Sequence, residues 1–290
     1  MATAATTLAT PDLHRPLART LTIYAKEAKY EFLKCLRLRA YALSTIFFPL
    51  MFYVLFGLVM GRQSLGGIGG VSLTKYLIPT YGTFGVMGAS LFGTASLLAS
   101  ERGLGWLQVK RASPMPPFAY FTAKVVMSMV FSAIVVLLLL LLGVTLGGVQ
   151  IAPLDAAKLV ATLVAGALPF CAMGLAIGYF AGPTSAPAIT NMIYLPLSFC
   201  SGLWIPFMFL PKVVREIAVF LPPYHLSQLA LSVVGAGRGE SNLTHWEVLI
   251  GFTLLCLGAA WIGFRRDEDK CTVRESFSVC NCTAPNPADM

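Results

Sequence analysis

The residues able to carry out chemistry are few in this chain, and their spacing fits no catalytic or metal site. Seven cysteines are scattered over 290 residues, and Cys280 and Cys282 near the end show neither zinc-site spacing nor a disulfide framework. We interpret His225 as a side chain reaching toward a membrane interface, since it has no catalytic partner pattern. The segment GAGRGE at 235–240 lacks the Lys of a phosphate-binding loop. We therefore predict no catalytic, cofactor-binding or metal-binding residue, and expect that this chain is not an enzyme.

The chain that must position these few cysteine, histidine and charged residues is strongly apolar. Hydrophobic residues make up 57% of the chain and charged residues only 12%, whereas a soluble domain has about 25% charged residues. This composition predicts an integral membrane protein. The net charge of +8 is also compatible with nucleic-acid binding, but the basic residues follow membrane topology, so we expect no nucleic-acid partner.

Six charge-poor windows have the length of about 20 residues that a bilayer-spanning helix needs. They lie at approximately 41–61, 77–99, 125–147, 158–180, 186–210 and 246–264. An even number of spans puts both termini on one side, and that side carries 15 of the 21 Lys and Arg residues, which predicts cytoplasmic termini. No window has an ionisable residue at its middle, which argues against a proton-driven carrier or a membrane enzyme.

The charged stretch ERGLGWLQVKRASPMPPFAYFTAK, residues 101–124, interrupts the apolar spans on the predicted cytoplasmic side. It mixes apolar residues such as Trp106 and Val109 with charges and ends in Pro114, Pro116 and Pro117. The pattern is typical of a short amphipathic helix that lies flat and offers an apolar face to a partner or to lipid. From periodicity alone, a solvated loop remains an equal alternative.

This stretch resembles the cytoplasmic segment that follows the second span of ABC-2 type exporter permeases. The matching positions are Glu101-Arg102, Gly105, Leu107, Ser113-Pro114 and Ala123-Lys124. Trp106 and Lys110 depart from the pattern, which usually has Thr and an apolar residue there. The resemblance implies that this is the coupling helix, seated in a groove of a separate ATP-hydrolysing subunit. The coupling residues it implies are Glu101, Arg102, Leu104, Gly105, Leu107, Pro114 and Lys124.

A second resemblance to the same family lies at residues 195–231. It rests on Ser201-Gly202, Pro206, Leu210-Pro211 and Leu221-Pro222-Pro223-Tyr224. From the residues alone, two apolar pieces too short to cross the bilayer predict a segment that enters it and returns. The resemblance places such re-entrant helices on the outer face, where we expect a gate. Its candidate residues are Pro206, Pro211, Pro222, Pro223, Tyr224 and Leu226.

The N-terminal stretch 21–40 has the pattern of an interfacial helix. Apolar side chains recur at spacings of three and four, as at Ala28, Phe32 and Cys35, while most lysines lie elsewhere around the helix. Such a helix rests on the inner membrane surface, where its basic side chains meet anionic lipids. A flexible basic arm is the alternative. In the family that the chain resembles, a similar helix also touches the ATPase subunit.

The predicted fold is therefore an all-α membrane protein with six transmembrane helices, an N-terminal amphipathic helix, a coupling helix between spans 2 and 3, and re-entrant helices between spans 5 and 6. We expect an N-terminal segment at 1–40, a six-span domain at 41–264 and a poorly ordered cytoplasmic tail at 265–290. The resemblance implies a second permease copy or a similar permease, and two ATP-binding subunits that hold ATP and Mg. It also implies location in a bacterial cytoplasmic membrane.

The cargo is predicted only by class. The uncharged spans carry aromatic residues that suit a hydrophobic or amphipathic compound such as a drug, an antibiotic or a lipid-like molecule. The candidate wall residues are Phe47, Phe52, Tyr194, Phe199 and Trp204. Lipid-facing positions are the alternative for these rings. Export of a polysaccharide or lipid-linked glycan is the alternative function within the family, and a channel or secondary carrier is the alternative of another class.

Overall fold

The computed structural model describes residues 17–61, 70–112 and 118–282, and within these ranges the regular elements are all helices. The helices up to Gly103 are α1 Leu17–Arg37, α2 Arg39–Phe52, the π-helix η1 Tyr53–Met60, α4 Leu73–Leu91, the π-helix η2 Phe92–Ser96 and α5 Leu97–Gly103. After it come α6 Trp106–Ala112, α7 Ala119–Thr145, α8 Pro153–Ala165, α9 Leu168–Phe180, α10 Ala186–Cys200, the 3-10 helix η3 Phe207–Phe209, α11 Lys212–Ala218, α12 Pro222–Val233 and α13 Asn242–Cys282.

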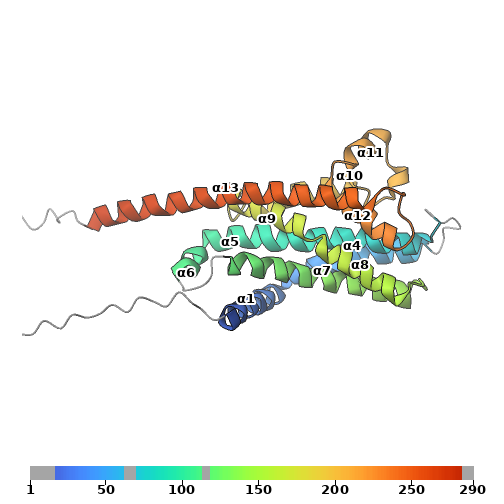
Figure 1. Cartoon of the computed structure of the whole chain (residues 1–290), viewed down its shortest axis with the longest axis horizontal. Coiled ribbons are helices and arrows are strands. Elements are labelled where there is room, and N and C mark those ends of the chain that lie inside the picture. Colours follow the sequence, from blue (N-terminus) through green and yellow to red (C-terminus); the bar gives the residue numbers. More distant parts are fainter. Residues whose placement is uncertain (1–16, 62–69, 113–117, 283–290) are drawn as a thin grey trace, which may run out of the picture.

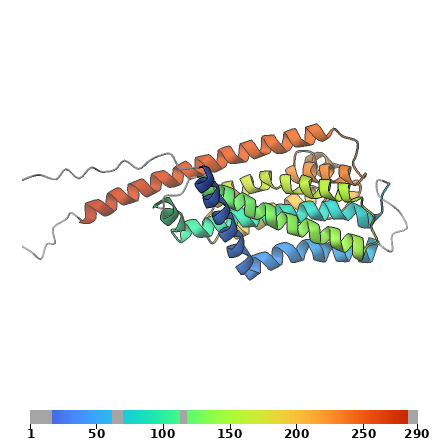
Figure 2. The ribbon, with the colours of Figure 1, turned by 60° about the horizontal axis from the view of Figure 1, so that its bottom comes forward.

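Most of these helices run side by side in one bundle, and α1 crosses them (Figures 1 and 2). α1 lies at the same end of the bundle as α6, whereas α11 and α12 lie at the opposite end (Figure 1). The predicted apolar stripe of α1 packs on α7, where the rings of Phe32 and Phe131 are 5.4 Å apart and Cys35 is fully buried. Residues 21–37 are therefore a helix rather than an arm.

Five helical stretches of the described residues are long and apolar enough to cross a membrane. They are Arg39–Met60, Leu73–Gly103, Ala119–Thr145, Pro153–Phe180 and Asn242–Asp267. The predicted window 186–210 differs, because α10 ends at Cys200 and the chain then turns through Gly202, whose φ is +73°. A helix of 15 residues is only about 22 Å long, less than a hydrocarbon core of about 30 Å.

The core of the bundle forms around α4. Its large side chains Tyr81, Phe84 and Met87 are buried, and it packs against α2, α7, α9 and α12. Glycines make these close approaches possible, because an added Cβ at Gly85 would clash with Val135 of α7 and one at Gly88 with Tyr194 of α10. These positions are used for close helix packing within one chain.

Prolines begin most helices at the end of the bundle that carries α11 and α12. Pro206 precedes η3, Pro211 precedes α11, and Pro222 and Pro223 are the first residues of α12. Proline suits these positions, because the first N–H groups of a helix have no carbonyl partner within it. The proline-rich segment is thus a chain of short helices joined by turns.

The structure differs from the sequence expectation at the C-terminus. α13 continues as one helix of 41 residues to Cys282, where we had expected a poorly ordered tail from residue 265. The physical reason is that residues 265–282 contain no Pro or Gly, so nothing in the sequence stops the helix. Residues 283–290 lie outside the described part of the chain.

Candidate functional site

A buried ionic cluster joins three helices at the end of the bundle near α6. Lys124 of α7 is completely buried, and its ammonium group lies 2.7 Å from a carboxylate oxygen of Glu31 on α1 and 3.1 Å from one of Glu101 on α5. Lys34 of α1 also pairs with Glu101 and lies 3.6 Å from Glu31. The hydroxyl of Tyr120 donates a hydrogen bond to Glu101. Two carboxylates thus face two ammonium groups, and the cluster is electrically balanced.

The balance of charge explains how the cluster tolerates burial. Burial raises the pKa of the Glu31 carboxyl, but Lys124 and Lys34 lower it further, so its pKa lies below the usual value. Burial and the nearby Lys124 together lower the pKa of Lys34. Taking one partner out of such a cluster would leave a buried charge without compensation. The cluster therefore holds α1, α5 and α7 at fixed positions relative to one another.

Arg102 joins the same end of α5 to two further helices. Its guanidinium donates to the carbonyl oxygens of Gly178 at 2.6 Å and Tyr179 at 2.7 Å, at the end of α9, and pairs with Asp267 of α13 at 2.8 Å. Consecutive residues of a helix point about 100° apart, so Glu101 and Arg102 reach different neighbours. Both side chains contact their own chain, whereas from the sequence we expected them to reach a partner.

The short helix α6 follows α5 directly and presents an apolar face. Gly105, with a φ of +74°, ends α5 in the left-handed conformation that glycine favours, and α6 follows. Leu104, Trp106 and Val109 are exposed. Leu107 is 8% exposed and belongs to a buried cluster with residues of α7, α9 and α13, so it is not part of this exposed face.

Lys110 gives a reason for one departure from the family pattern. Its ammonium group pairs with Glu27 of α1 and lies 4.5 Å from the centre of the Tyr120 ring. α6 is therefore tied to α1 as well as to α5. Pro114, one of the seven predicted coupling residues, lies outside the described residues.

The predicted gate residues gather at the opposite end, where four of the six are buried in the core and the other two are not. Pro222, Pro223, Tyr224 and Leu226 are buried, whereas Pro206 is partly buried and Pro211 is exposed. Tyr224 and Leu226 of α12 are fully buried, and Leu226 packs into the space that Gly166 leaves open at the turn between α8 and α9. His225 differs from its expected interfacial position, since it is buried and bonded. Its Nδ1 lies 2.8 Å from Nδ1 of His245 on α13, and its Nε2 lies 2.7 Å from the carbonyl oxygen of Val219.

Three of the five predicted wall residues meet in one aromatic cluster. The rings of Phe52 and Trp204 are 4.9 Å apart, and Phe84 bridges them to Tyr194, whose ring is also 4.9 Å away. These rings fill the core around α4. Phe47 and Phe199 lie apart from this cluster and are 54% and 45% exposed.

Several residues of these sites were not found from the sequence. Glu27 and Glu31 are the acidic residues of an otherwise basic α1, and their separation of four places them on one helix face. That pattern was a usable signal for partners elsewhere in the chain. Asp267 and His245 offered no such signal. Among the described residues, no group of three or more His, Cys, Asp or Glu side chains is placed to hold a metal ion.

Comparison with known proteins agrees with this architecture. The ABC-2 type transporter family matches residues 27–234, which include the ionic cluster, α6 and α12. A protein of Bacillus subtilis (strain 168) described as "Putative transport permease YvfS" is 25% identical over 217 residues, which cover 75% of this chain and 87% of that protein. Because the family match extends over most of the residues, the chain belongs to the ABC-2 type transporter family.

Proposed function

We propose that this chain is the six-span permease half of an ATP-driven exporter, with both termini in the cytoplasm of a bacterial cell. A separate ATP-binding subunit, present in two copies, would hold ATP and Mg and would dock on α6. A second copy of this chain or a similar permease would complete the pathway. α10 and the turn after it would provide the fifth crossing, and α11 and α12 the re-entrant pair on the outer face.

The ionic cluster is the observation that carries this proposal. α6 and the turn before it offer exposed Leu104, Trp106 and Val109 to a partner. α6 is tied through Lys110 to α1 and through the chain to α5. Since Lys124 links α5 with α1 and α7, a displacement of α6 is transmitted to three helices at once. A loop without such links would absorb the displacement.

The docking test uses the permease expressed together with its proposed ATP-binding subunit. Replacing exposed Trp106 by Asp should abolish co-purification and permease-stimulated ATP hydrolysis, because a charge on the apolar face opposes burial in a groove. Phe220→Asp is the matched control, since Phe220 is 81% exposed between α11 and α12, at the other end. Equal co-purification of both variants with the ATPase would overturn the proposed docking face.

Topology and cargo have their own tests. A reporter fused after Met290 should be cytoplasmic, and one inserted near Gly239 should be outside the cell. Both reporters on one side of the membrane would contradict six spans.

For the cargo we propose an amphipathic compound, and an accumulation assay with a panel of amphipathic drugs tests this. Uptake or efflux that continues without ATP hydrolysis would support a channel or carrier instead.

A further inference from the structure

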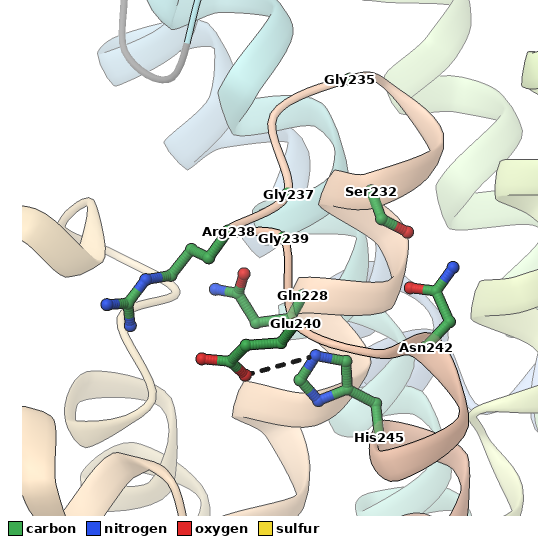
Figure 3. Close-up of a pocket in the computed structure, with 9 residues that line it drawn as sticks. All are labelled: Gln228, Ser232, Gly235, Gly237, Arg238, Gly239, Glu240, Asn242 and His245. Carbon is green, nitrogen blue, oxygen red and sulfur yellow. Dashed lines mark ion pairs between the residues drawn. The ribbon is translucent and has the colours of Figure 1, made fainter.

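A polar cavity of about 280 Å³ lies at the end of the bundle away from α1 and α6. It is enclosed by α12, the start of α13 and the glycine-rich loop that joins them (Figure 3). Since a water molecule occupies about 30 Å³ of liquid, a cavity of this size holds several waters and has room for a small polar group of a ligand. Its polar side chains therefore decide which chemical group it accepts.

The first of these side chains is a buried hydrogen-bond acceptor without a donor. Gln228 of α12 lines the cavity and is only 4% exposed. Its Oε1 has no hydrogen-bond partner among the described residues. A buried polar atom without a partner is unfavourable, so a ligand that donates a hydrogen bond to Gln228 would satisfy it.

The second acceptor is the Glu240 carboxylate, which the nearby arginine does not neutralise. The two carboxylate oxygens of Glu240 lie 3.3 and 3.5 Å from the Tyr224 hydroxyl, which are long distances for a hydrogen bond. Arg238 instead lies over the ring of Phe207, 4.5 Å from its centre, and donates a hydrogen bond to the Tyr224 hydroxyl at 3.3 Å. Among the ion pairs of the described residues, Glu240 has His245 as its partner and not Arg238 (Figure 3). The carboxylate therefore keeps most of its capacity to accept hydrogen bonds.

The third acceptor follows from the protons of the two histidines. The Val219 carbonyl can only accept, so Nε2 of His225 must carry the proton and, in the neutral ring, its Nδ1 carries a lone pair. Nδ1 of His245, 2.8 Å away, must then donate, which leaves the lone pair of neutral His245 on Nε2. Burial lowers the pKa of His225, which favours its neutral form. Nε2 of His245 faces Glu240 at 3.5 Å, so two acceptors face each other there.

We propose that this cavity binds a protonated primary amine, with its N–H groups directed to Gln228, Glu240 and His245. An ammonium group supplies both the positive charge that Glu240 lacks and the donors that all three acceptors need. A metal ion fits less well, since the described residues hold no cluster of metal ligands. The amine belongs to an amphipathic molecule in the membrane, either a lipid headgroup or, on the proposed export function, the cargo itself.

Protons compete with the amine for the same site. His245 contacts three groups: His225 of α12, Glu240 of the loop and the ring of Tyr224. The Tyr224 hydroxyl also accepts a hydrogen bond from the guanidinium of Arg238. A proton added to Nε2 of His245 would pair with Glu240 and remove two of the three acceptors. Amine binding should therefore weaken as pH falls through the histidine range.

The test is a binding measurement on the purified permease alone in nanodiscs, so its result does not depend on an ATPase partner. Octylamine should bind at neutral pH, whereas octyltrimethylammonium, which has the same charge but no N–H, should bind at least about tenfold more weakly. Glu240→Gln and Gln228→Leu should each weaken octylamine binding by about tenfold or more. Glu247→Gln is the control, because Glu247 is exposed on α13 and lies outside the cavity.

Two further arms identify the source of the amine and the competing proton. If the natural ligand is a lipid headgroup, phosphatidylethanolamine nanodiscs should reduce octylamine affinity relative to phosphatidylcholine nanodiscs; unchanged affinity would indicate a cargo amine. At about pH 5 octylamine should bind more weakly than at neutral pH. Equal binding of the two octyl compounds, or wild-type binding by Glu240→Gln, would overturn the proposal.

Discussion

The ionic cluster and the polar cavity at the other end of the bundle use charged side chains in opposite ways. Around Lys124, two carboxylates and two ammonium groups from α1, α5 and α7 satisfy one another. In the cavity, Gln228, Glu240 and His245 are all acceptors, and the contacts of Glu240 are 3.3 Å or longer. The first site is complete within the chain, and the second needs a donor from outside.

This difference distinguishes a structural site from a binding site. We call the ionic cluster of Glu31, Lys34, Glu101 and Lys124 the brace, because it holds helices together. Buried ion pairs add little net stability, but removing one partner is costly, so they hold helices in one arrangement. Unpaired acceptors in an open cavity leave interaction energy that a ligand can use. The brace lies beside the proposed docking helix α6, where rigidity transmits force, and the cavity lies at the proposed outer end, where molecules enter or leave.

The largest effect is expected from breaking the brace. Lys124→Met would leave Glu31 and Glu101 buried with one ammonium group fewer, which should destabilise the protein by about 3–5 kcal/mol. Thermal unfolding of the detergent-purified protein would measure this. Lys158→Met is the control, because Lys158 and its partner Asp155 are exposed, and it should have almost no effect. Equal unfolding temperatures would show that the cluster does not hold the helices.

A smaller loss is expected at the neighbouring junction. Arg102→Lys keeps the charge but cannot reach the carbonyls of Gly178 and Tyr179 and the carboxylate of Asp267 at once. We expect a loss of about 1–3 kcal/mol, because hydrogen bonds to charged groups contribute about that much. The exposed Arg37→Lys should change nothing measurable. An unaffected Arg102→Lys protein would mean that α9 and α13 are held by packing alone.

The fold was predictable where apolar runs end at charges. Five predicted spans coincide with long helices, because hydropathy reports which residues leave water. It does not report turns, so the window 186–210 looked continuous although α10 stops at Cys200. The same limitation applies to α13, where polar residues after 264 suggested disorder but nothing in them breaks a helix.

The site was predictable only in part, because its partners are distant in sequence. The motif identified Glu101, Arg102 and Lys124, but Glu31 precedes Lys124 by 93 residues and lies on another helix. Local spacing cannot show that α1 crosses the bundle and meets α7. The His225–His245 pair was missed for the same reason, since each histidine looks isolated in its own segment.

A pH experiment sharpens the comparison further. The pKa of Glu31 is lowered in the folded protein, so the unfolded state binds more protons near that pKa. The stability contributed by the ionised Glu31 is therefore present above about pH 4.5 and is lost as pH falls below it. Between neutral pH and about pH 3, the unfolding temperature should fall more in wild type than in Glu31→Gln, with the difference developing below about pH 4.5. Parallel profiles would mean that Glu31 gains nothing from its lysines.

The smallest effect on stability is expected from Glu240→Gln in the cavity, and the same substitution at Glu101 in the ionic cluster is its comparison. Glu101→Gln removes a buried charge that faces Lys124 and Lys34, and about 3 kcal/mol of stability should be lost. Glu240→Gln removes a carboxylate that is 45% exposed and has only long contacts, so the change should stay within about 0.5 kcal/mol. A Glu240→Gln protein that is as stable as wild type but no longer binds octylamine would separate binding from folding at this residue. If Glu240→Gln unfolds as readily as Glu101→Gln, Glu240 is part of a second brace, and the distinction between the two ends of the bundle fails.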